Sequence, residues 1–121
     1  MTTKLTRDQE RASHAYKSVA NVTGQVKEYK VLVNALGPNV VRSGFAAAIA
    51  FLQRTNNVAR DQFARDLASG FPRELQMGSD LTTLSQRVRT MPIEDYMLAT
   101  REALKLAQWF KRALQAHTVD K

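Results

Sequence analysis

The stretch YMLATREALKLAQWFKRALQAH, residues 96–117, constrains the fold more than any other, because it contains neither glycine nor proline. Its apolar residues recur at the spacing of one helix face. They are Tyr96, Ala99, Ala103, Ala107, Phe110 and Leu114, with Ile93, Met97 and Leu104 widening the stripe on one side and Leu98, Leu106, Trp109 and Ala113 on the other. A helix this apolar needs more than one neighbour to cover it. We therefore predict a long helix, opened by Pro92, that packs inside a helical protein.

The N-terminal segment predicts a second amphipathic helix. Thr6 and Gln9 have the spacing of a capping box, so we expect a helix to begin there and to end near residues 21–24. Its apolar face would be Leu5, Ala12, Tyr16 and Val19, with Lys4, Arg7, Arg11, His14 and Ser18 opposite, toward solvent.

The centre of the chain supplies further helices. We predict one over residues 25–36, ended by Gly37-Pro38, and another over residues 38–54 that is apolar nearly all round and buried. Helices over residues 58–69 and 81–89 follow. No stretch alternates at period two over the length of a strand. The expected fold is all-α: a single compact bundle of about six helices, with residues 1–121 forming one domain.

Composition favours a polyanionic partner. The net charge is +7, and residues 1–60 carry nine Lys and Arg against three acidic residues. A basic balance of this size is typical of nucleic-acid-binding proteins. There is no cysteine, no signal-peptide pattern in MTTKLTRDQE, and no apolar run longer than residues 44–52. These features favour a cytoplasmic protein without a membrane segment.

Catalytic chemistry has little support in the sequence. His14 and His117 lie on expected helix surfaces without an acidic residue at orienting spacing, and Glu94-Asp95 fits the first turn of a helix. No metal-ligand spacing, phosphate-binding loop or nucleophile elbow is present. We therefore expect no catalytic residue, no metal and no cofactor.

Two features leave alternatives open. The row Lys4, Arg7 and Arg11, with Lys17 nearby, suits a phosphate backbone but also suits a solvated helix face. Trp109 lies between Lys105 and Arg112, where it can fill a gap in the core, anchor a protein interface or stack on a base.

Three segments carry a resemblance to a known family. They are AYKSV (residues 15–19), LGPNVVRSGFAAAIAFL (36–52) and residues 96–117, whose Y-x-x-x-T-R-E-x-L…W-F-K-R order is the most specific. In this order they resemble the small subunit of the type III-B CRISPR RNA-silencing complex, the Cmr complex. The sequence departs from the family pattern at Gly37-Pro38, where Leu-Pro is expected.

The resemblance implies a small all-α subunit without enzymatic activity of its own. It implies stacking of copies head to tail, beside the backbone subunits that hold the crRNA, with a basic face lining the channel for the crRNA and its target RNA. Cleavage of the target would belong to the backbone subunit, and cyclic oligoadenylate synthesis to the large subunit. The small subunit would contact only the backbone and shape of the RNA.

Candidate contacts follow from the charges and this resemblance. For RNA we expect Arg7, Arg11, Lys17, Arg42, Arg101, Lys105 and Arg112, and for the subunit interface Trp109 and Leu98. A DNA-binding regulatory or architectural protein is one alternative, although the segment after Gly37-Pro38 offers few side chains that read base edges. A structural adaptor that binds acidic protein surfaces is another.

Overall fold

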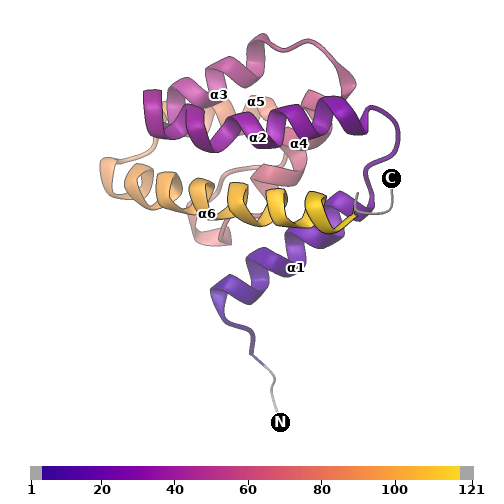
Figure 1. The fold of residues 1–121 in the computed structure, drawn as a ribbon. Helices are drawn as coiled ribbons and strands as arrows, with labels where there is room; N and C mark the ends of the chain where they lie inside the picture. The colour runs from indigo at the N-terminus through magenta and orange to yellow at the C-terminus, as the bar shows by residue number, and fades with distance from the viewer. Residues whose placement is uncertain (1–3, 118–121) are drawn as a thin grey trace.

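Six α-helices and one short 3-10 helix make up residues 4–117, the part of the chain that the computed structural model describes (Figure 1). The elements are α1 (Arg7–Ala20), α2 (Val26–Ser43), α3 (Phe45–Arg54), α4 (Val58–Ser69), η1 (Arg73–Leu75), α5 (Leu81–Thr90) and α6 (Ile93–His117). No strand occurs among these residues. The all-α prediction, with about six helices in one bundle, is confirmed.

Helix α1 begins as the sequence predicts but is rotated about its axis. The Thr6 hydroxyl accepts from the Gln9 amide, and the Gln9 side chain accepts from the Thr6 amide, which completes the capping box. The buried residues, however, are Arg11, Ala15, Ser18 and Val19, whereas Tyr16 is 47% exposed. The predicted solvent face was therefore wrong. Helical periodicity assigns Arg11 to solvent, but in the structure Arg11 is buried because it binds the carboxylate of Glu102 on α6.

Helix α2 does not stop at Gly37-Pro38, so the predicted boundary was wrong. The helix continues through Pro38 to Ser43 and ends at Gly44, whose φ of 94° and ψ of 163° only glycine adopts readily. Pro38 lies on an exposed side of the helix. There its missing amide costs one helical hydrogen bond without opening the core.

Short helices α3, α4 and α5 complete the bundle. The first amides of α3 are supported by the Tyr96 hydroxyl, which accepts from the Ala46 amide at 3.0 Å. Asn57 caps α4 and Asp80 caps α5, each by accepting from the amide three residues on. The prediction that the apolar helix over residues 38–54 is buried holds only in part, because Phe51 is 46% exposed.

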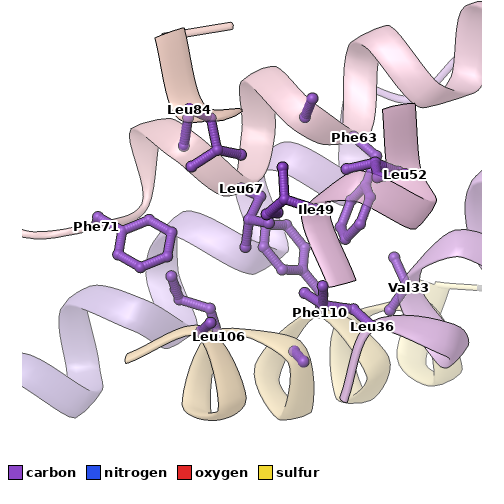
Figure 2. Close-up of a cluster of buried hydrophobic side chains, with 14 of the residues drawn as sticks. Val33, Leu36, Ile49, Leu52, Phe63, Leu67, Phe71, Leu84, Leu106 and Phe110 are labelled. Carbon is purple, nitrogen blue, oxygen red and sulfur yellow. The ribbon is translucent and has the colours of Figure 1, made fainter. Parts of the chain in front are cut away.

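Helix α6 lies antiparallel to α2 and also packs against α1 (Figure 1). Ala99, Ala103, Phe110 and Leu114 are fully or almost fully buried, as the wheel predicts. Phe110 packs edge-on against Phe63 of α4, among the apolar side chains shown in Figure 2. Three flanking residues differ, since Ile93, Met97 and Leu98 are 67%, 53% and 51% exposed. The long helix therefore supplies core on one side and a free surface on the other.

Candidate nucleic-acid interface

Arg7 and Arg11 face a buried carboxylate. Arg11 is 8% exposed and grips Glu102 with two parallel hydrogen bonds, Nε to Oε2 at 2.6 Å and Nη2 to Oε1 at 3.0 Å. The Arg7 Nη2 atom donates to Glu102 Oε2 and to the Gly70 carbonyl, both at 2.6 Å. The two arginines thus join α1 to α6 and to the end of α4.

Glu102 is held as an anion between these arginines. Burial alone would raise the pKa of its carboxyl, but the hydrogen bonds from Arg11 and Arg7, together with their charges, keep that pKa below its usual range. Sequence reasoning missed Glu102 because it lies 91 positions from Arg11. The only signal was an acidic residue beside the apolar stripe of residues 96–117.

Trp109 closes the other side of the seam between α1 and α6. Its indole Nε1 donates to Asp8 Oδ1 at 3.0 Å, and Arg112 lies with its guanidinium carbon 4.7 Å from the centre of the ring. The hydrogen bond from Trp109 lowers the pKa of the Asp8 carboxyl, and the hydrogen bond and charge of Arg11 lower it further. The side chain is half-buried and packs against the core, which supports the first of the three interpretations.

The other five residues expected to contact RNA are exposed. Arg101, Lys105, Lys111 and Arg112 are exposed on α6, and the single acidic residue between positions 96 and 117 is the buried Glu102. On the adjacent helix α2, Lys30 and Arg42 are exposed as well. We call these six side chains the basic face; sequence reasoning did not include Lys30 and Lys111 among the RNA contacts. Lys17 is also exposed, on the side of α1 that points away from α6.

A groove separates the two helices of the basic face. Its volume is about 250 Å³, and it is lined from α2 by Asn34, Pro38 and Val41 and from α6 by Gln108 and Lys111. Amide, amine and apolar groups therefore meet in one concave strip. Such a surface can bind an extended polyanion along its phosphates without reading its bases.

Three polar side chains, those of His14, Tyr29 and Asp66, make contacts inside the fold. His14 is half-buried, with Nε2 2.6 Å from the Asp66 carbonyl oxygen and its ring edge-on to Phe110, so its predicted surface position was wrong. The buried Tyr29 hydroxyl donates to Asp66 Oδ2 at 2.7 Å. Burial raises the pKa of both the Tyr29 phenol and the Asp66 carboxyl. Residues 4–117 contain no group of three or more His, Asp or Glu able to hold a metal ion.

The helices in this part of the chain are too short or too polar to span a bilayer.

The described residues form a small, all-helical fold with exposed basic residues on α2 and α6. The model of the CRISPR-associated Cas_Cmr5 family matches residues 7–117. The CRISPR system Cmr subunit Cmr5 of Thermus thermophilus is 32% identical over 113 residues, covering 92% of this chain and 95% of that protein. The crystal structure of a CRISPR-associated Cmr5 family protein from Thermus thermophilus superposes with a TM-score of 0.81 at 31% identity, covering 93% of this chain and 97% of that one.

The chain belongs to the Cas_Cmr5 family. This is the family of the small subunit of the type III-B Cmr complex, so the resemblance inferred from the sequence is confirmed.

Proposed function

We propose that this protein is the non-catalytic small subunit of a cytoplasmic type III-B CRISPR effector and that its basic face lines the channel for the crRNA and target RNA. Family membership supports the assembly with backbone and large subunits. The observation that supports the RNA role is the basic face itself, which carries six exposed cations along two antiparallel helices.

The seven residues expected to contact RNA do not all belong to the basic face. Arg42, Arg101, Lys105 and Arg112 belong to the basic face, and we propose them as the phosphate contacts. Arg7 and Arg11 already neutralise Glu102, so their charge is directed inward. Lys17 lies on another side of the molecule and would contact RNA only where a neighbouring subunit brings it there.

We also propose that copies stack head to tail. Exposed apolar side chains gather where α2 ends and α6 begins, at Val41, Ile93 and Met97, and Leu98 is exposed on the next turn. At the opposite end, where α2 and α4 begin, Val26 and Val58 are exposed (Figure 1). Two different apolar ends suit a heterologous contact that propagates along a filament.

Purification of the protein from its native host tests this function. The expected result is recovery of larger partner subunits together with small RNAs that share a repeat-derived 5′ end. Nuclease treatment should release part of this material. Recovery of the protein without RNA and with every partner retained after nuclease treatment would favour the structural adaptor. Tight, sequence-dependent binding of duplex DNA in a mobility-shift assay would favour the DNA-binding alternative.

A further inference from the structure

A second groove, between α2 and α3, is separate from the basic face. It has a volume of about 230 Å³. Val31, Leu32 and Ala35 line it from α2, and Phe51 and Leu52 line it from α3. Its floor includes the fully buried ring of Phe63, which is labelled in Figure 2. The groove is thus an opening in the wall of the hydrophobic core.

The rims of this groove are apolar and exposed. Val31 is 62% exposed and Phe51 is 46% exposed, although both are large hydrophobic side chains. The volume lies below the roughly 300–1,000 Å³ of most small-molecule sites. It is suited to a few apolar side chains presented by another polypeptide, as in the binding of an amphipathic helix to a groove.

The charges around the groove select the partner. Lys27 is exposed on α2 and Arg54 is exposed at the end of α3, whereas Glu28 is the only acidic residue in residues 26–54. In the neighbouring turn of α4, Asp61 is paired with Arg60 at 2.7 Å. An occupant with carboxylates beside its apolar side chains would therefore be attracted to a cation on each of the two helices that form the groove.

RNA fits this groove less well. The exposed aromatic ring that could stack on a base is Phe51, and the Arg54 guanidinium carbon already lies 5.6 Å from the centre of that ring. Asn39 and Thr55 are the two polar residues of the lining, and the other lining residues are apolar. A protein segment needs only apolar contact at these positions.

We propose that the groove between α2 and α3 binds an acidic amphipathic segment of a partner protein. Its apolar side chains lie between Val31 and Phe51, and its carboxylates lie toward Lys27 and Arg54. This surface is distinct from the basic face, so the protein would hold RNA on one side of α2 and a protein partner on the other.

A matched pair of valines on α2 tests the proposal. Val31 borders this groove and Val41 borders the other, and both are largely exposed, so neither Val31→Ser nor Val41→Ser should disturb the core. The probe is a short fluorescein-labelled helical peptide with leucines on one face and glutamates beside them. Fluorescence anisotropy measures its binding to the full-length chain, with a lysine-for-glutamate peptide and single-stranded oligouridine as comparisons.

The glutamate peptide should bind the wild type and Val41→Ser alike and Val31→Ser about tenfold more weakly, as expected for the loss of one buried valine. The lysine peptide should bind more weakly than the glutamate peptide, and oligouridine binding should be unchanged by Val31→Ser. Equal effects of the two valine variants, or equal binding of the two peptides, would overturn the proposal. Weaker oligouridine binding by Val31→Ser would instead assign the groove to RNA. Neither result bears on the Cmr assembly, which is tested separately.

Discussion

The ion pair between Arg11 and Glu102 shows how one residue can reverse the expected direction of a helix face. Both side chains are less than a tenth exposed, and the carboxylate accepts three hydrogen bonds from Arg7 and Arg11. A buried pair of this kind contributes little net stability, but the loss of one partner leaves an uncompensated buried charge. We therefore assign Arg11 to the attachment of α1 rather than to RNA.

Replacement of Arg11 by alanine should destabilise the protein by about 3–5 kcal/mol, because Glu102 would lose its bidentate partner. Lys17→Ala is the matched control, since it removes a cation from the exposed side of the same helix. Its effect should stay within about 0.5 kcal/mol. Urea unfolding at neutral pH measures both. A similar small effect of both variants would contradict the assignment.

The same pair predicts a loss of stability in acid. The folded-state pKa of Glu102 is lowered, so the folded protein resists protonation at this site more than the unfolded chain does. The contribution of Glu102 to the free energy of unfolding is complete above its pKa in the unfolded chain, near 4.5. It is lost as the pH falls through the lower pKa of the folded state. Asp8 and Asp80 add to the slope with the same sign. In urea unfolding across the acid range, Glu102→Gln should show a shallower decline than the wild type, whereas an identical slope would contradict the account.

At the scale of the elements, most helices could be predicted because their signals are local. The capping box at Thr6 and the caps at Asn57 and Asp80 depend on residues three positions apart. The end of α2 could not be predicted in this way, because Gly37-Pro38 is the stronger local signal and Gly44 is the actual break. At this break the Tyr96 hydroxyl of α6 accepts from the Ala46 amide of α3, a long-range contact that no local pattern contains.

Two glycines in this region should therefore respond in opposite ways to alanine. Gly44→Ala should destabilise the protein by about 1–3 kcal/mol, because its backbone conformation disfavours a side chain. Gly37 lies inside α2, where an added Cβ would make an ordinary contact of 3.9 Å with Ala107. Gly37→Ala should be neutral or stabilise by about 0.5–1 kcal/mol. Thermal unfolding of the two variants measures the contrast, and the reverse order would place the helix end at Gly37 after all.

At the scale of the whole molecule, the sequence predicted only some of the basic residues that are exposed. The basic charge and the narrow polar strip of residues 96–117 pointed to RNA, and Arg101, Lys105 and Arg112 are indeed exposed. The site could not be completed from sequence because Arg7 and Arg11 resemble Lys17 in any local pattern. Only the long-range contact with Glu102 separates them.

Head-to-tail stacking through the two apolar ends predicts a directional filament whose growth a single substitution at either end can block. Ile93→Glu should block one end and Val58→Glu the other, since these side chains are 67% and 66% exposed. Each variant alone should sediment as a monomer, and an equimolar mixture should stop at dimers, because only one productive contact remains. Sedimentation velocity at high protein concentration measures this. Unhindered association of both variants would place the contact elsewhere.

The salt dependence of RNA binding tests whether the basic face contacts RNA. The measurement compares target-RNA affinity of the assembled complex across salt concentrations for the double variant Arg101→Gln, Lys105→Gln and for the control Arg65→Gln, Arg73→Gln, whose exposed arginines lie on α4 and η1. The slope of log affinity against log salt should fall by about 0.7 for each phosphate that the first variant no longer neutralises, and it should remain unchanged in the control. An unchanged slope in the first variant, or an equal decrease in both, would contradict the account.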